Sequence, residues 1–150
     1  MAPRTTRTIR SPIFIHASTK QVFRAITEPE LMTRWFMDRA SLTPRKGGTY
    51  AFSWEDGPTH TGTVLEFVRG KRLTLTWQWP GHERLPRTTL RLSVEPREGG
   101  SVLTFTHSGF RKHGAWVDLY DGAIRGWTYF QMNLKSVLEN GHDLRSPYDW

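Results

Sequence analysis

His107 is the ionisable side chain that the sequence places best for chemistry. Apolar and hydroxyl residues alternate around it, which puts His107 on the same face of a predicted strand as Leu103 and Phe105. A histidine in such surroundings donates or accepts a hydrogen bond near neutral pH. Either a backbone carbonyl or a neighbouring hydroxyl satisfies the imidazole near the strand end, or the imidazole orients a polar atom of a bound ligand. In an enzyme, His107 would act as general acid or base, assisted by Tyr50 or Tyr120.

Aromatic side chains are the second indication of a binding site. They make up 13% of the residues and include seven tryptophans. Core packing explains any one tryptophan, but so many large rings in one small domain favour a cavity that they line. The residues that we expect to line this cavity are Trp35, Tyr50, Phe52, Trp54, Leu75, Trp77, Trp79, Leu92, Phe105, His107, Tyr120, Ala123, Trp127 and Phe130. No residue is assigned a firm catalytic role.

Other classes of site have little support in the sequence. The chain has no cysteine, which excludes disulfides, thiolate metal sites and cysteine nucleophiles. Its histidines are scattered and form no His-Glu-x-x-His pattern, so we predict no metal site. Ser108 lacks the leading glycine of a nucleophile elbow. The paired glycines precede strands rather than helices, so we predict no phosphate cradle and no cofactor.

The charge of the chain points to no particular partner. Its formal net charge is +7, from 21 Lys and Arg against 14 Asp and Glu. The basic residues are spread singly along the chain and no nucleic-acid-binding motif organises them, so we expect solvated surface charge and no specific nucleic acid. The chain shows neither a signal-peptide pattern nor a membrane-spanning apolar run, so we expect a cytoplasmic protein without membrane insertion.

The longest predicted element is a helix over residues 114–141, ended by Gly141. Its apolar residues recur at steps of three and four, so one stripe should face an apolar surface while the other side meets water. The predicted water-facing residues are Asp118, Asp121, Arg125, Gln131, Lys135 and Glu139. Gly122 and Gly126 each cost about 1 kcal/mol relative to Ala in a helix interior. Either the helix packs closely on a neighbouring backbone there, or the missing side chains leave room for a guest beside Ala123 and Trp127.

The rest of the chain reads as strands with two short helices near the start. A strand over 9–16 contains Pro12 and is therefore expected at an edge. Ser18 with Gln21 forms a capping box for a helix that ends at Glu28, and a second short helix follows at 30–36. Alternating apolar residues then predict strands at 49–54, 60–68, 72–79, 90–95 and 103–108. This order predicts one α+β domain over 1–150, with loose termini at 1–8 and 142–150.

Five short motifs in this order resemble the START-like (SRPBCC) superfamily and, within it, the Aha-type family related to the activator of the heat-shock-protein-90 ATPase. The motifs are Thr27-Glu28-Pro29-Glu30-Leu31-Met32-Thr33-Arg34-Trp35-Phe36, Gly47-Gly48-Thr49-Tyr50-Ala51-Phe52, Gly62-Thr63-Val64-Leu65-Glu66-Phe67, Leu73-Thr74-Leu75-Thr76-Trp77 and Thr106-His107-Ser108-Gly109-Phe110. The resemblance implies a helix-grip fold, in which a curved antiparallel sheet wraps around the long C-terminal helix and encloses an apolar pocket. It also implies relatives that bind lipids, polyketides and other hydrophobic molecules, some cyclases or dehydratases, and a co-chaperone.

These observations favour a protein that binds a hydrophobic small molecule of lipid, polyketide or aromatic type between the sheet and the C-terminal helix. Two alternatives stay open. One is a polyketide cyclase or dehydratase-like enzyme that uses His107, and the other is a co-chaperone-like module that binds a protein partner such as a chaperone. Whether the protein is an enzyme, which ligand it binds and its oligomeric state are left open by the sequence.

Overall fold

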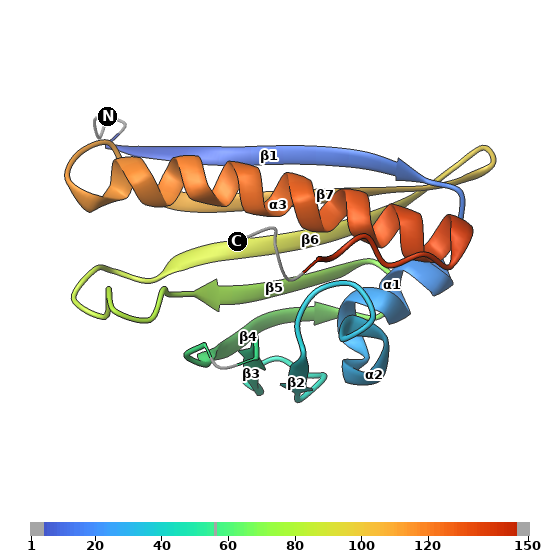
Figure 1. Ribbon diagram of the computed structural model, residues 1–150, viewed down its shortest axis with the longest axis horizontal. Helices are drawn as coiled ribbons and strands as arrows, with labels where there is room; N and C mark the ends of the chain where they lie inside the picture. Colours follow the sequence, from blue (N-terminus) through green and yellow to red (C-terminus); the bar gives the residue numbers. More distant parts are fainter. Residues whose placement is uncertain (1–4, 56, 147–150) are drawn as a thin grey trace.

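The computed structural model of the chain describes residues 5–55 and 57–146. In chain order its elements are β1 (Thr6–Ile15), α1 (Thr19–Thr27), α2 (Pro29–Met32), β2 (Arg39–Leu42), β3 (Thr49–Ser53), β4 (His60–Val68), β5 (Arg72–Trp77), β6 (Thr88–Arg97), β7 (Gly100–Arg111) and α3 (Ala115–Asn140) (Figure 1). The strands form one seven-stranded antiparallel sheet in the order β1-β7-β6-β5-β4-β3-β2. The predicted α+β class and helix-grip architecture are confirmed.

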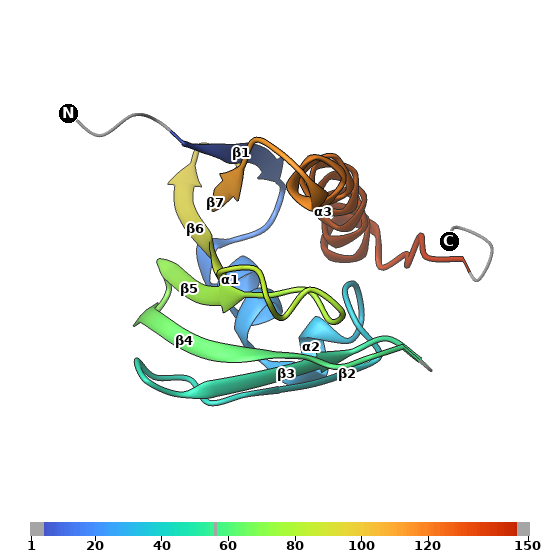
Figure 2. The same cartoon turned by 90° about the vertical axis from the view of Figure 1, so that its left-hand side faces the viewer.

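The sheet is strongly curved, and its concave side holds the helices (Figure 2). Hairpin loops connect consecutive strands from β2 through β7. Strand β1 pairs with β7 and forms the other edge of the sheet. Pro12 lies in that edge strand, opposite Thr104, where a missing backbone N–H costs least. Viewed end-on, α3 lies beside β1 and β7, whereas β2 and β3 form the opposite limb of the curve. The helix therefore covers the β1–β7 side of the concave face and leaves the side near β2 and β3 uncovered.

Several predicted boundaries were wrong for local reasons. The first strand begins at Thr6, so residues 6–8 pair with β7 instead of forming a loose terminus. Strand β2 was not predicted, because its four residues offer only Ala40 and Leu42 as an alternating apolar pair. The second helix is confined to Pro29–Met32, and β5 ends at Trp77, which leaves Trp79 in a loop. Residues 1–4 and 147–150 of the two predicted termini lie outside the described residues.

Helix α1 begins as the sequence predicted. Ser18 adopts an extended backbone conformation at the N-cap, and its hydroxyl oxygen accepts a hydrogen bond from the backbone N–H of Gln21. The Gln21 side chain in turn accepts from the backbone N–H of Ser18 at 3.0 Å, which completes the capping box. The cap directs Val22, Phe23 and Ile26 into the concave side of the sheet, where all three are buried.

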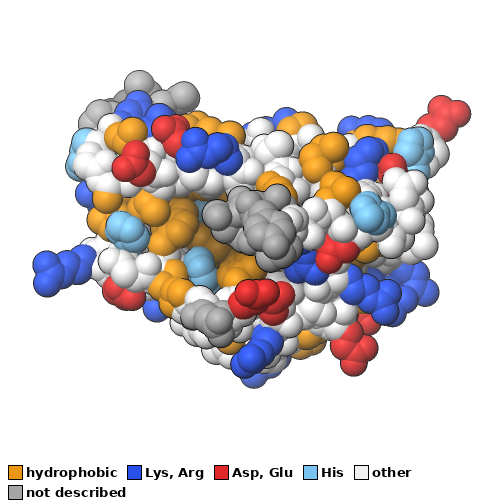
Figure 3. Space-filling model, in the orientation of Figure 1, with side chains coloured by type: hydrophobic (Ala, Val, Ile, Leu, Met, Phe, Trp, Pro, Cys, Tyr) orange, Lys and Arg blue, Asp and Glu red, His pale blue; other side chains and the backbone are white. Residues whose placement is uncertain are grey.

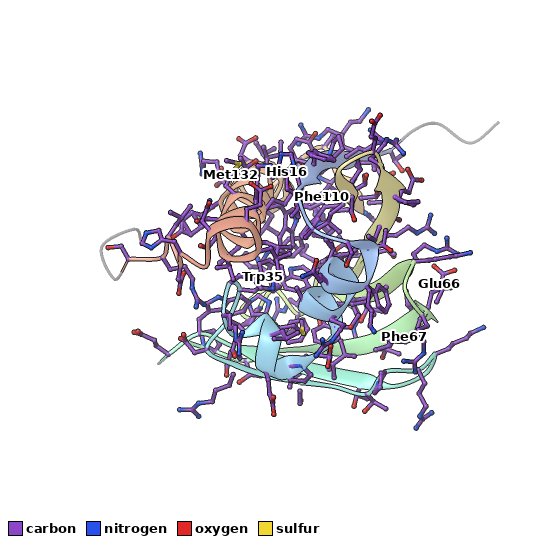
Figure 4. All side chains as sticks on the ribbon, turned by 90° about the vertical axis from the view of Figure 1, so that its right-hand side faces the viewer. His16, Trp35, Glu66, Phe67, Phe110 and Met132 are labelled. Atoms are coloured by element: carbon purple, nitrogen blue, oxygen red, sulfur yellow. The ribbon has the colours of Figure 1, made fainter. Side chains whose placement is uncertain are left out.

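Helix α3 buries most of the predicted apolar stripe, and it also buries wholly or partly three polar side chains that were assigned to its water-facing side, those of Gln131, Lys135 and Glu139. Gln131 is 3% exposed because its amide accepts from the Ser11 hydroxyl at 2.6 Å and donates to the Ser11 carbonyl at 2.7 Å. Lys135 is half-buried and its ammonium donates to the Phe14 carbonyl. Both contacts tie the helix to edge strand β1, which explains why polar residues lie there. Met132 marks the outer side of the helix (Figure 4).

The two helix glycines have no packing role within the described residues. A Cβ added at Gly122 or at Gly126 would have no non-local neighbour within 4 Å. The interpretation that these glycines permit close packing on a neighbouring backbone was therefore wrong. Gly62 shows the opposite situation, because a Cβ there would lie 2.6 Å from the Tyr50 ring.

We expect Gly122→Ala and Gly126→Ala to stabilise the protein. Each adds helix propensity worth up to about 1 kcal/mol without creating a clash. Urea unfolding followed by circular dichroism measures the change. Gly62→Ala is the matched control and should destabilise, since its Cβ meets Tyr50. A loss of stability in both helix variants would contradict the assignment of open space beside them.

Candidate ligand-binding cleft

Most of the aromatic residues predicted to line a cavity instead fill the core. They contact one another at ring distances, as in Trp77 with Trp127 at 5.2 Å between ring centroids. The predicted lining residues that are at most 9% exposed are Trp35, Tyr50, Phe52, Leu75, Trp77, Leu92, Phe105, His107, Ala123, Trp127 and Phe130. Tyr120 is half-buried and its ring carries the Arg7 guanidinium at 3.8 Å from the ring centroid. The interior between sheet and helix is thus largely occupied by side chains.

A cleft of about 880 Å³ lies beside that core. It is bordered by α3, the β3–β4 loop and the loop after β5, and hydrophobic side chains are exposed in it (Figure 3). Of the predicted lining residues it contains Trp54, Trp79 and Phe130. The other lining residues are Asp38, Glu55, Gly57, His60, Asp143, Arg145 and Ser146. The volume is within the range of small-molecule sites.

Contacts with the core fix the three aromatic rings of the cleft. The Trp54 indole N–H donates to the Phe36 carbonyl at 2.8 Å. Trp79 stacks on the His107 ring, with 5.6 Å between centroids and an interplanar angle of 17°. Phe130 packs edge-on against Phe36 at 4.8 Å. The apolar wall is therefore preformed, which lowers the ordering cost of binding.

The segment after α3 forms the polar wall of the cleft. The buried Asn133 side chain on the helix accepts from the Leu144 backbone N–H at 2.6 Å and donates to Asp143 at 2.9 Å. Arg145 pairs with Asp143 at 2.8 Å and also donates to the Thr33 carbonyl at 2.9 Å. The Arg145 hydrogen bonds lower the pKa of Asp143 to about 2. Residues 142–146, expected to be part of a loose terminus, are thus held by specific contacts.

His60 is a cleft residue that sequence reasoning considered only as a metal ligand. Burial lowers the pKa of His60, and a hydrogen bond to the Gln78 backbone opposes this shift. A hydrogen bond raises the pKa of a histidine when the ring is the donor. The neutral His60 ring therefore donates its one N–H to the Gln78 backbone. Nδ1 is buried and has no partner among the described residues. This nitrogen is enclosed by protein atoms and is not presented to the cleft.

Apart from His60, the first residue of β4, the cleft residues that the sequence did not identify lie in loops or in the segment after α3, where no periodicity marks them. Both the β3–β4 loop and the loop between β5 and β6 join antiparallel neighbours, and alternate hairpin loops lie at the same end of a sheet. That rule was the available signal for bringing Trp54, Glu55 and His60 together with Trp79. Nothing in the sequence indicated that Asp143 and Arg145 return to the same place.

His107 is fully buried in a continuous chain of hydrogen bonds. The Trp127 indole N–H, which is only a donor, lies 2.9 Å from His107 Nδ1. Nε2 therefore carries the proton and donates to Thr88 Oγ1 at 2.7 Å. The Thr88 hydroxyl donates to the Trp77 carbonyl at 2.9 Å. Burial lowers the pKa of His107 to about 3, so the ring is neutral at pH 7.

The chain leaves no ring nitrogen of His107 available to a ligand in this arrangement. The sequence offered two interpretations of His107. The geometry agrees with the one in which a neighbouring hydroxyl group satisfies the imidazole. Tyr50, named as a catalytic assistant, donates its own hydroxyl to the Thr76 carbonyl. The described residues contain no group of three or more His, Asp or Glu side chains placed to hold a metal ion. Within the same residues, no helix is both long and apolar enough to cross a membrane.

We expect the protein to lose stability as the pH falls from 7 to 5. The His107 pKa is about 3 in the folded protein against an ordinary value of 6.5, so protons bind the unfolded chain first. Stability present above pH 6.5 is lost as the pH falls toward 3, and His107 accounts for about 2 kcal/mol between pH 7 and pH 5. Urea unfolding at both pH values measures the difference. His107→Gln should lose most of this pH dependence and His60→Gln only a smaller part, whereas an unchanged slope in His107→Gln would contradict the assignment.

Comparisons with known proteins agree with this architecture. The family model described as "Activator of Hsp90 ATPase homolog 1-like protein" matches residues 16–139. A comparison with curated proteins found no match. Among solved structures, protein MLL2253 from Mesorhizobium loti is 27% identical with a TM-score of 0.79, over 91% of this chain and 99% of that chain.

Two further structures share the fold. The AHSA1-like protein from Rhizobium etli is 25% identical with a TM-score of 0.75, over 95% of this chain and 88% of that chain. DynU16, from the dynemicin biosynthetic locus, is 22% identical with a TM-score of 0.79, over 96% of this chain and 51% of that chain. The family match covers most of the sequence and confirms the resemblance to the Aha-type SRPBCC proteins. This chain belongs to the family of Activator of Hsp90 ATPase homolog 1-like proteins.

Proposed function

We propose that the protein binds a hydrophobic small molecule, of lipid, polyketide or aromatic type, in the cleft between α3 and the β3–β4 and β5–β6 loops. The observation that carries the proposal is an 880 Å³ hollow that exposes Trp54 and Trp79 beside an otherwise filled core. Burial of an apolar ligand against such rings yields about 25 cal/mol per Å² removed from water. The polar residues at the rim then set the orientation of the ligand.

The likeness to DynU16 supports the same proposal at the level of the fold. That protein comes from a biosynthetic locus, and its structure superimposes on nearly the whole of this chain. The fold therefore occurs in a setting where small organic molecules are handled. The binding site proposed here still rests on the cleft residues of this chain, because a shared fold does not determine a ligand.

The two alternatives fare differently in the structure. An enzyme that uses His107 as acid or base lacks support, because both ring nitrogens are engaged and the side chain is 0% exposed. A protein-interaction role has one favourable observation, the exposure of Val117, Ile124 and Met132 on the outer side of α3. It is a second candidate function, located on a face distinct from the cleft.

Binding of N-phenyl-1-naphthylamine, a neutral probe that fluoresces in apolar surroundings, tests the proposal. We expect saturable binding that Trp79→Ala weakens about tenfold, since loss of about 60 Å² of apolar contact is worth about 1.5 kcal/mol. Met132→Ala is the matched control, because this side chain is 49% exposed on the outer side of α3. Circular dichroism verifies that both variants are folded.

Two results would contradict the proposal. One is the absence of saturable binding by the wild-type protein. The other is an equal loss of affinity in Met132→Ala and Trp79→Ala, which would place the probe on the outer face of the helix.

A further inference from the structure

The lining of the cleft carries the opposite charge to the whole molecule. The chain has a net charge of +7, yet the cleft contains three carboxylates, of Asp38, Glu55 and Asp143, against the single guanidinium of Arg145. Acidic side chains border the hydrophobic hollow in Figure 3. A ligand at the mouth therefore meets a local excess of negative charge.

The guanidinium that lines the cleft, that of Arg145, already has hydrogen-bond partners in the protein. Arg145 pairs with the Asp143 carboxylate and donates to the carbonyls of Thr33 and Met37. The Trp54 indole N–H is likewise engaged, on the Phe36 carbonyl. Neither group is available to neutralise an anionic ligand without breaking contacts that hold the cleft walls.

The remaining groups that line the cleft attract positive charge rather than repel it. The faces of Trp54 and Trp79 carry the negative side of an aromatic quadrupole, which attracts a cation lying over the ring. Carboxylates at the rim add full negative charges. The chemistry that fits such a set is a hydrogen-bond donor with positive charge.

The backbone holds two of the carboxylates at one place on the rim. Glu55 has φ of 34°, in the left-handed region that a non-glycine residue rarely adopts. Its backbone N–H donates to the Asp38 carboxylate, which keeps the strained turn in place. Residues held in such conformations gather at ligand sites, where surrounding contacts maintain them. The pair Asp38 and Glu55 is therefore a built part of the mouth.

We propose that the ligand of this cleft is a cationic amphiphile, with an apolar body against Trp54, Trp79 and Phe130 and a protonated amine at the mouth beside Asp38 and Glu55. The inference rests on the proposed binding function and narrows it. Ligands that end in a carboxylate, such as fatty acids, are disfavoured at the same site. The preference falls as salt is added, because rim charges are screened.

Three probes with the same aromatic body test the charge preference. They are the amine 1-naphthylmethylamine, the alcohol 1-naphthylmethanol and the carboxylate 1-naphthaleneacetate. Isothermal titration calorimetry at pH 7 measures the affinity of each at low and at high salt. We expect the amine to bind tighter than the alcohol and the alcohol tighter than the carboxylate. Glu55→Gln and Asp38→Asn should each reduce the amine-to-alcohol ratio by up to about fivefold, the range for one solvent-exposed ion pair. The amide introduced by Asp38→Asn retains an oxygen that accepts from the Glu55 backbone N–H, so the turn is preserved.

Glu98→Gln is the matched control, because it removes the same charge from the exposed β6–β7 turn. It should leave the amine-to-alcohol ratio unchanged. Equal affinities for the three probes, or tighter binding of the carboxylate, would overturn the charge inference while leaving apolar binding in place. Failure of all three probes to bind would overturn both the inference and the proposed function.

Discussion

A buried chain of hydrogen bonds from Trp127 through His107 and Thr88 to the Trp77 carbonyl fixes α3 on the sheet. It joins the helix to β7, β6 and β5, so one polar path crosses the aromatic core. Each buried polar atom in it has a partner, and removal of any member would leave another unsatisfied at a cost of about 1–3 kcal/mol. The neutral state of His107 is part of this arrangement, because a second ring proton would meet the Trp127 donor. These hydrogen bonds therefore set the distance of the helix from the strands and its rotation about its own axis.

The position of α3 in turn determines where space is left. The helix is held to β1 through the Ser11 contacts of Gln131 and to β7 through the Trp127–His107 hydrogen bond, while the opposite limb of the curved sheet lies away from it (Figure 2). Rings of the helix and of the sheet interlock there, with 5.4 Å between the ring centroids of Trp127 and Phe105. The remaining volume lies on the open side, where Phe130 is the helix ring that lines the cleft. A filled core and an open cleft are thus products of the same packing.

The sequence predicted the inward faces of the elements better than the space between them. Alternation placed Phe52, Leu75 and Phe105 on the concave face correctly, because period and burial are local properties of a strand. Whether facing rings interdigitate depends on helix rotation and sheet curvature, which no single segment encodes. Gln131 illustrates the limit, since its burial depends on a partner 120 residues earlier in the chain. His60 illustrates it again, because its significance arises only when loops distant in sequence converge.

The carboxylates of the cleft lie outside the aromatic core that stabilises the fold. Asp38, Glu55 and Asp143 belong to exposed loops or to the segment after α3, whereas the aromatic core lies behind them. Substitutions at exposed positions usually change stability by less than about 0.5 kcal/mol. Descendants of one ancestral gene can therefore acquire new ligand preferences through loop changes alone, without passing through unfolded intermediates along the way. A change of ligand preference on a constant scaffold is the expected evolutionary consequence of the proposed site lying at the edge of the core.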